Sequence, residues 1–546
     1  MWVVAGMAHA QIAPDAGSIL RDQQKPALEL PTRPAPSIKL DEPARPALKP
    51  SDTRFVLKSV RITGNAAFTQ DELLAVVQAF IGKEVGFADL DQAAARISRY
   101  YRERGYMVAR AYLPAQDIKD GAVEIAVIEG RFGKVELDNK SRVRDRVVRN
   151  HLDTLPGATV YELALERKLL LLGDLPGVGD ARASLRPGAN VGETDLAVVV
   201  TPVPLVNGSI EFDNHGNRFT GANRATGKIN LMSPLGLGDT LNVLFTKGFN
   251  GLDYGRLGYQ VPIGSDGFKL GGAYSKSHYR LGKNFAASDA NGDADTYNLS
   301  ASYPFIRSRN VNLSGQVNAD WRNFQDRDVG GNKDKQTRST TLTLAGDARD
   351  ALAGGGISVF SLAYSGGWVD LETPAILLND DNSAHTNGHY DKWNLNFLRL
   401  QNLSQRASLY FSFSGQKAGK NLDSSERFVL GGAQGVRAYP QGEGVGDSGY
   451  LATAELRYTI TPDATLGVLQ PFVFFDSGGV TINQHPFVAN QANRRTLSGA
   501  GFGLAWVKAN DFQVKLTLAT RVGQRVSVSS DTDRHTRGWV QLIKYF

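Results

Sequence analysis

Two short motifs in the C-terminal part of the chain contain residues that could form an ion pair. They are Val436, Arg437, Ala438 and Tyr439 in a glycine-rich segment, and Phe474, Asp476 and Gly478 further along. An arginine guanidinium binds a carboxylate at two points and also stacks on an aromatic ring, which a lysine does less well. Alternate side chains of a strand share one face, so Phe474, Asp476 and Gly478 would form a single stripe. The pattern predicts a loop that folds into a pore and is pinned to its wall.

Composition limits the classes of protein that fit. The chain has 546 residues and no cysteine, which excludes disulfides, thiolate metal sites and cysteine nucleophiles. A net charge of +6 with 21% charged residues gives no reason to expect a nucleic-acid partner. No stretch approaches the ~18 consecutive apolar residues of a transmembrane helix, but membrane barrels escape that test because their apolar residues alternate.

Other motif matches lack the structural context that their chemistry needs. Gly444, Gly446 and Gly449 fit the spacing of a dinucleotide fingerprint, but no β-α-β unit surrounds them. One predicted external loop contains His385, His389, Asp380, Asp381 and Asp391. We favour a solvated polar loop there over a surface metal site. The sequence has no P-loop, zinc-protease helix or serine elbow, so it predicts no enzyme, no cofactor and no metal.

The first residues resemble the end of a secretory signal. Residues 1–10 are apolar, and residues 8–10 match a small-residue cleavage site that gives a mature start at Gln11. Because the first basic residue is Arg21, we expect the true start to lie upstream. A frayed apolar N-terminus is the alternative interpretation.

A short helix and a long tether follow the signal remnant. Residues 11–25 contain the predicted helix, over 14–25, and residues 26–52 form a proline-rich linker. In polyproline II form, at about 3.1 Å per residue, such a linker could reach about 75 Å, more than the ~30 Å of a hydrocarbon core. The helix could therefore enter a pore as a plug and leave it again. An ordinary disordered tail is the alternative.

Residues 53–130 and 131–203 repeat one order of elements, β-α-α-β-β. In the first unit Thr69 is expected to cap a helix and Asp89 to open a second one. The strands that close this unit are expected at 107–113 and 122–129. In the second unit the helices are expected at 143–155 and 161–175, and the closing strands at 180–186 and 193–202. Two helices on a three-stranded sheet can make an independent core.

From residue 204 to residue 546 the period of the pattern is two. Near its start Ile210 and Phe212 oppose Glu211 and Asp213. A soluble sandwich would bury apolar side chains on the face that is charged here, so the pattern is typical of a membrane barrel. About sixteen such segments occur, an even number as in bacterial barrels, and their connections alternate short and long. The long connection 419–447 contains Arg437 and falls between the eleventh and twelfth strands, on the extracellular side.

Four segments give the chain a resemblance to a known family. They read PDAGSILRDQQ near the mature start, FDNHGNRFTGANRATGKINLMSPLGLGD at the barrel entry, SERFVLGGAQGVRAY in the long loop and FVFFDSGG in the wall. The chain resembles the outer-membrane transporters of two-partner secretion, relatives of the haemolysin and filamentous-haemagglutinin exporters. The implied fold is mixed: an N-terminal plug helix, two periplasmic polypeptide-transport-associated (POTRA) domains and a 16-stranded transmembrane antiparallel β-barrel.

The resemblance also implies a function and partners. The POTRA domains would bind the N-terminal secretion domain of a secreted partner protein, such as an adhesin, haemolysin or contact-dependent toxin, and the barrel would be the pore. The other expected partners are outer-membrane lipid and, during biogenesis, the barrel assembly machinery. The chain is expected to be a monomer, and no nucleic acid is expected.

The resemblance further implies that Arg437 reaches into the barrel and pairs with Asp476. This pair could serve transport or only hold the barrel in shape. The family motif usually has glycine where this chain has Ala438, and alanine tolerates positive φ poorly. The loop tip must then use a backbone conformation that alanine accepts, or carry strain.

Three other functions are alternatives to export. An outer-membrane insertase of the same superfamily fits the barrel, but the paired POTRA units with a tethered helix favour an exporter. A diffusion porin would leave the POTRA pair without purpose. A barrel enzyme would need a lumenal catalytic group, and none is evident.

Overall fold

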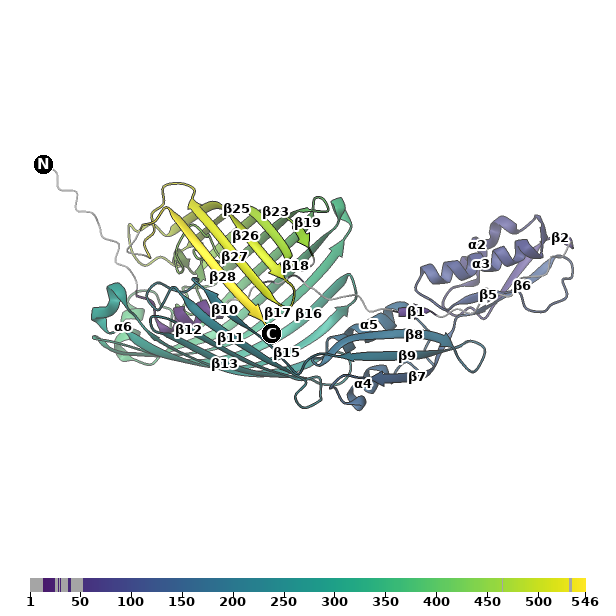
Figure 1. Ribbon diagram of the computed structural model, residues 1–546, viewed down its shortest axis with the longest axis horizontal. Coiled ribbons are helices and arrows are strands. Elements are labelled where there is room, and N and C mark those ends of the chain that lie inside the picture. The colour runs from purple at the N-terminus through teal and green to yellow at the C-terminus, as the bar shows by residue number, and fades with distance from the viewer. Residues whose placement is uncertain are drawn as a thin grey trace.

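The computed structural model describes residues 13–24, 28, 30, 38–40, 53–463, 465–529 and 533–546. The predicted signal remnant and most of the predicted linker lie outside the described residues. Two α/β domains extend in a row from one end of a barrel (Figure 1). No helix of the described part is both long and apolar enough to span a membrane.

The first α/β domain packs two helices on a small sheet. Its elements are β2 Arg54–Val56, β3 Ser59–Thr63, α2 Gln70–Val77, β4 Glu84–Gly86, α3 Phe87–Glu103, β5 Arg110–Tyr112 and β6 Ala122–Ile128. The sheet order is β3-β6-β5, and β2 and β4 form a separate ribbon. As predicted, Thr69 caps α2, in a reciprocal capping box with Glu72. The strand expected at 107–113 is shorter because a turn closes from the Ala109 amide to the Tyr106 carbonyl.

The second α/β domain repeats this plan. Its elements are β7 Arg131–Asn139, α4 Asp145–Leu152, α5 Glu162–Gly173, β8 Val178–Pro187 and β9 Glu193–Pro202. The sheet order is β1-β8-β9-β7, where β1, Ile38–Leu40, comes from the predicted linker. Strand β1 runs parallel to β8, with Ile38 opposite Ala183 and Leu40 opposite Leu185. This added strand was not predicted from the sequence.

The rest of the chain is a closed antiparallel barrel with neighbours in sequence order. Its strands are β10 Val206–Asp213, β11 Arg224–Met232, β12 Thr240–Gly248, β13 Leu252–Pro262, β14 Lys269–Arg280, β15 Asn291–Arg307, β16 Val311–Asp328, β17 Gly331–Asp350, β18 Gly356–Leu371, β19 Gly388–Asn402, β20 Ala407–Ala418, β23 Ser448–Tyr458, β24 Ile460–Asp463, β25 Gly467–Thr481, β26 Arg494–Lys508, β27 Phe512–Arg521 and β28 Thr536–Tyr545. Segments β23 and β24 pair with the same strand, β25, and so fill one position of the wall. The barrel is therefore 16-stranded, as predicted, and β10 closes it against β28.

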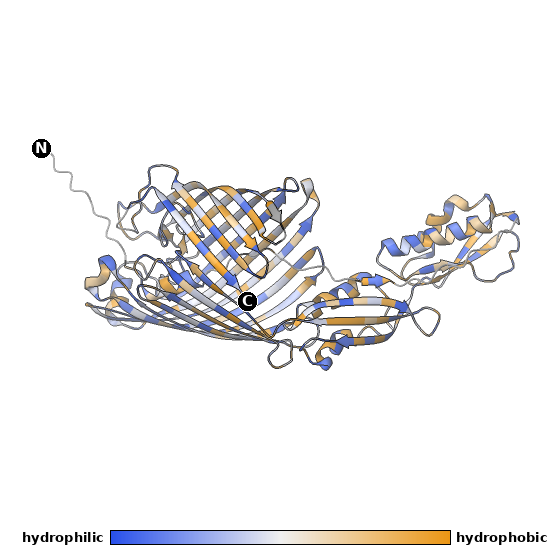
Figure 2. Cartoon of the chain, viewed as in Figure 1, coloured by the Kyte–Doolittle hydropathy of each residue, from blue (hydrophilic) through white to orange (hydrophobic). Residues whose placement is uncertain are grey.

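The barrel wall has an apolar outer face and a polar inner face. Ile210 and Phe212 are 48% and 49% exposed, whereas Ser209 and Asp213, on either side of this pair, are buried. Figure 2 shows the same alternation of apolar and polar residues along the strands. An apolar outside on a polar inside suits a wall that faces lipid.

Ion pairs dock the second α/β domain to one end of the barrel. The Asp174 carboxylate, after α5, accepts hydrogen bonds from Nε and Nη2 of Arg307 at 2.7 and 2.9 Å. Glu166 on α5 accepts from the backbone amide of Arg309 at 2.7 Å. The long connections lie at the opposite end, and one of them carries the unpredicted helix α6, Pro374–Asp381.

Candidate functional site

Loop 419–447 folds into the barrel. Its strands β21, Phe428–Val429, and β22, Val445–Gly446, pair as a short ribbon that carries the tip inward. Val436, Ala438 and Tyr439 at the tip are fully buried, and Arg437 is 5% exposed. All four residues of the predicted loop motif therefore lie inside the pore.

Arg437 is bonded to two strands of the wall. Its Nε and Nη2 donate to the two carboxylate oxygens of Asp476 at 2.8 and 2.7 Å, and its backbone amide donates to Asp476 at 3.1 Å. Its Nη1 donates to Glu455 at 2.6 Å. The guanidinium carbon lies 3.4 Å from the ring centroid of Phe474. The geometry combines a two-point charge-assisted bond with stacking, a combination that suits arginine and not lysine.

The inner stripe of β25 makes room for this contact. Phe474 and Asp476 are buried, whereas Val473 is 54% exposed on the other face, as strand parity predicts. A Cβ atom at Gly478 would lie 2.5 Å from the Tyr450 carbonyl oxygen and 2.6 Å from the Leu430 side chain. The glycine therefore lets Leu430 of loop 419–447 approach the wall.

Ala438 uses an ordinary backbone conformation. The described non-glycine residues with positive φ do not include it. A Cβ atom at Gly499 on the facing wall would lie 2.6 Å from the Cβ of Ala438. Of the two alternatives left by the sequence, the tip therefore adopts a conformation that alanine accepts, and it fits closely against a glycine.

Glu455 is a part of this site that the sequence interpretation missed. It is 4% exposed and bonds both Arg437 and Arg457 on its own strand. Strand parity could have identified it, because Glu455 and Thr453 alternate with outward residues and so share the inner face of β23. Thr453 donates to Asp476 at 2.9 Å.

Two further buried carboxylates fix the loop to its neighbours and were also missed. Glu443 pairs with Arg495 and accepts bonds from Ser527 and Ser529, which belong to loop 522–535. Asp447 accepts from Arg427 at 2.9 Å and from the Gln484 amide at 2.8 Å. Gln484, Ser527 and Ser529 lie in two other loops and Arg495 on β26, so no local period in the sequence points to these contacts.

Helix α1, Ala16–Gln23, lies inside the barrel near the extracellular end. Its apolar residues Ile19 and Leu20 pack in one cluster with Leu252 and Tyr279 of the wall. The amide of Ala16 donates to Asp326 on β16 at 2.8 Å. The helix thus occupies the lumen, as a plug would.

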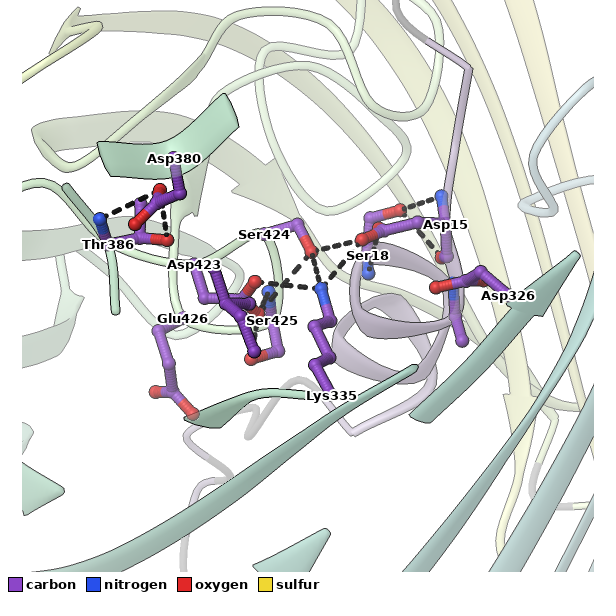
Figure 3. Close-up of polar contacts among 12 residues, drawn as sticks. Asp15, Ser18, Asp326, Lys335, Asp380, Thr386, Asp423, Ser424, Ser425 and Glu426 are labelled. Atoms are coloured by element: carbon purple, nitrogen blue, oxygen red, sulfur yellow. Dashed lines mark hydrogen bonds and ion pairs between the residues drawn. The ribbon is translucent and has the colours of Figure 1, made fainter. Parts of the chain in front are cut away.

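A single lysine connects the helix, the wall and loop 419–447 (Figure 3). Nζ of Lys335 on β17 lies 2.9 Å from the carboxylate of Asp15, the N-cap of α1, and 2.7 Å from that of Asp423 in the loop. Ser424 donates to Asp15 as well, and Arg21 donates to the Ser424 carbonyl at 2.7 Å. The helix and the loop are therefore two parts of one seal.

On the far side of this seal the lumen keeps a cavity of about 960 Å³. Hydroxyl and amide side chains predominate in its lining, for example Ser275, Asn298, Thr341, Ser361, Asn394 and Ser412. Such side chains can exchange hydrogen bonds with a passing chain.

The external loop that contains His385 and His389 is held in place by hydrogen bonds to Asp380. Asp380 accepts from the amides of Thr386 and Asn387 at 2.9 Å each, which closes the turn after α6 (Figure 3). No group of His, Asp and Glu residues in the described ranges could hold a metal ion.

Comparison with known proteins agrees with this architecture. Residues 192–506 match the family described as haemolysin secretion/activation protein ShlB/FhaC/HecB, and residues 55–130 match the POTRA domain of ShlB type. The chain is 27% identical to the heme/hemopexin transporter protein HuxB of Haemophilus influenzae over 98% of this chain and 95% of that one. It is 22% identical to the outer membrane transporter CdiB of Dickeya dadantii, over 78% of this chain and 76% of that one.

Solved structures share the fold. CdiB from Escherichia coli superposes with a TM-score of 0.74 at 19% identity, covering 97% of this chain and 96% of that one. BamA from Haemophilus ducreyi lacking POTRA domains 1–3 superposes with a TM-score of 0.51 at 15% identity, over 90% of this chain and 100% of that one. The barrel spans the outer membrane and the POTRA domains are periplasmic. Because the family match covers more than half of its length, the chain belongs to the ShlB/FhaC/HecB family of haemolysin secretion/activation proteins.

Proposed function

We propose that this chain exports one large partner protein across the outer membrane by two-partner secretion. The observation that carries the proposal is the double seal, in which α1 and loop 419–447 fill the pore and are joined through Lys335. A diffusion porin needs an open lumen, whereas a pore with a removable seal suits the conditional passage of a long unfolded chain. The proposal assigns the chain no catalytic step.

The POTRA domains would supply the receptor for the unfolded partner. An exposed sheet edge can capture an extended peptide by strand addition. In the second domain the β8 edge is already paired with β1 of the chain itself. A substrate strand that took this edge would displace the linker that tethers α1. Because Asp174 and Arg307 hold this domain at the barrel mouth, displacement would occur next to the pore.

The partner is proposed by class. The HuxB relative is named a heme/hemopexin transporter, and the CdiB relatives are outer membrane transporters. For this chain we propose a large secreted protein, an adhesin, haemolysin or contact-dependent toxin, that carries an N-terminal secretion domain. We further propose that the transporter works as a monomer and is inserted by the barrel assembly machinery.

The proposal predicts that a neighbouring gene encodes a large secreted protein, and export of that protein tests it. The two genes are expressed in a Gram-negative host, and the partner is measured in the medium with and without the transporter. Release that depends on the transporter is the expected result. No release, together with a change in the levels of other barrel proteins, would instead identify an insertase.

A further inference from the structure

A cluster of arginines lies at the extracellular mouth, beside the loop tip but outside its contact with Asp476. Its members are Arg495 on β26, Arg521 on β27, Arg534 just before β28 and Arg537 on β28. Arg521 and Arg537 face the lumen, because they alternate with outward residues and share faces with buried Ala519 and Trp539. Arg537 is paired across the ladder with Ala519, so it is the diagonal neighbour of Arg521 at a Cβ separation of roughly 7–8 Å.

The carboxylates of this region do not accept hydrogen bonds from all the donors of these arginines. Glu443 bonds Arg495, Ser527 and Ser529, so its oxygens are already used. Asp533 pairs with one nitrogen of Arg521, Nη1. Among the described residues, the charges that act on Arg537 include these two carboxylates and the guanidinium groups of Arg521 and Arg534.

Five buried nitrogen atoms of the cluster have no acceptor among the described residues. They are Nε of Arg495, and Nε and Nη2 of both Arg521 and Arg537. The side chain of Arg521 is 2% exposed. A buried charged donor without a partner costs free energy, and like charges side by side add to that cost. An arrangement of this kind is explained by an ion or water that accepts from the free donors.

We propose that this cluster binds a small oxyanion, such as inorganic phosphate, between β27, β28 and the tip of loop 419–447. Two guanidinium forks with free Nε and Nη2 atoms present the paired donors that fit phosphate oxygens. The guanidinium carbon of Arg521 also lies 5.0 Å from the ring centroid of Tyr439, whose hydroxyl donates to the Arg525 carbonyl at 3.0 Å. The bound anion would therefore hold residues 521–529 and the loop tip together and strengthen the seal.

Hydrogen exchange of the full-length protein in detergent tests this site. Inorganic phosphate is titrated at constant ionic strength, with sodium chloride as the balancing salt. Peptides covering residues 521–529 and 436–443 should exchange more slowly in a saturable way, by about tenfold when phosphate is ten times its dissociation constant. The Arg537→Gln variant should lose this response, and Arg537→Lys, which keeps the charge without the fork, should weaken it.

Arg525 supplies the matched control. It is an exposed arginine within residues 521–529, and its part in the contact with Tyr439 is made by its backbone carbonyl. Arg525→Gln should keep the full phosphate response. An equal effect of chloride, or a phosphate response that survives in Arg537→Gln, would overturn the proposal. A response to lipopolysaccharide micelles but not to phosphate would also overturn it, since these arginines face the lumen.

Discussion

Lys335 of the barrel wall, a buried lysine, forms an ion pair at 2.9 Å with Asp15 of the plug helix. The same ammonium bonds Asp423 at 2.7 Å, so the two carboxylates share one cation. Without the cation they would face each other in a site with little water. The lysine therefore holds two acidic elements in the lumen that would otherwise repel.

Replacement of Lys335 by Met should release the seal. Breaking a buried ion pair by removing one partner costs about 3–5 kcal/mol. Here that cost destabilises the sealed state relative to the open state, because the pair exists only in the sealed state. Single-channel recordings in planar bilayers should show larger or more frequent openings than the unmodified protein. Lys333→Met is the control, because Lys333 pairs with Asp328 at 2.6 Å and its side chain is 48% exposed. Unchanged conductance in Lys335→Met would contradict the seal.

The Arg437 contact should be needed for export after the barrel has assembled. Arg437→Ala leaves Asp476 buried without its counter-charge and leaves Glu455 with Arg457 as its remaining arginine, so the loop tip should leave the wall. Arg437→Lys keeps the charge but loses the two-point bond and the stacking on Phe474. We expect export to fall by roughly tenfold or more in the alanine variant and by less in the lysine variant. A tenfold fall corresponds to about 1.4 kcal/mol of lost interaction free energy.

Assembly is measured in the same cells. Heat-modifiable migration of the barrel reports its folded level in the outer membrane, and export of the partner is scaled to that level. Arg406→Ala, at an exposed position in a periplasmic turn, is the control. If the folded level of Arg437→Ala fell in step with export, the contact would be structural and its role in transport would be rejected.

The inner stripe of the wall was predictable from the sequence, whereas the partners of the loop were not. Asp476 faces inward because strand parity is a local rule, and a buried carboxylate in a wall calls for an arginine. By contrast, Glu443 meets Ser527 and Ser529 from a distant loop, and Lys335 meets Asp15 across more than half of the chain. Such contacts depend on how the barrel closes, which no local pattern encodes.

The unpredicted elements have a similar cause. Strand β1, Ile38–Leu40, stands in a proline-rich segment that reads as a tether, and it becomes a strand only because the β8 edge offers a partner. Helix α6 begins with Pro374 at its first turn, a favourable start that the polar composition of the surrounding loop obscured.

The contact between Asp174 and Arg307 should fix the orientation of the second POTRA domain. Asp174→Asn removes the two-point ion pair and leaves Arg307, whose side chain is 8% exposed, without its counter-charge. Because the chain has no cysteine, spin labels can be placed at Asn190→Cys and Ser404→Cys alone. The distance distribution between them should broaden in Asp174→Asn.

The control for this measurement is a surface pair of the same domain. Asp180 bonds Arg182, whose side chain is 64% exposed, so the pair contributes little. Asp180→Asn should leave the distance distribution unchanged. A distribution that is equally narrow in Asp174→Asn would show that packing, and not this ion pair, sets the orientation.

Acid should loosen the second POTRA domain through His151. This side chain is buried in α4, 1% exposed, and burial lowers the pKa of its imidazole below the ordinary value despite a contact with the Val147 carbonyl at 2.9 Å. The unfolded histidine, with a pKa of about 6.5, binds its proton first as the pH falls. Stability is therefore fully present above about pH 6.5 and declines as the pH falls toward the lower pKa of the folded state.

Hydrogen exchange of α4 in the full-length protein measures this effect. After correction for the intrinsic pH dependence of exchange, peptides covering residues 145–152 should lose protection between about pH 7.5 and about pH 5.5. His151 is the only histidine between residues 53 and 203, so peptides of α3, residues 87–103, serve as an internal control. His151→Gln should be less stable at neutral pH but should respond less to acid, because its side chain does not titrate. Equal acid sensitivity in α3 and α4, or in His151→Gln and the unmodified chain, would place the titrating group elsewhere.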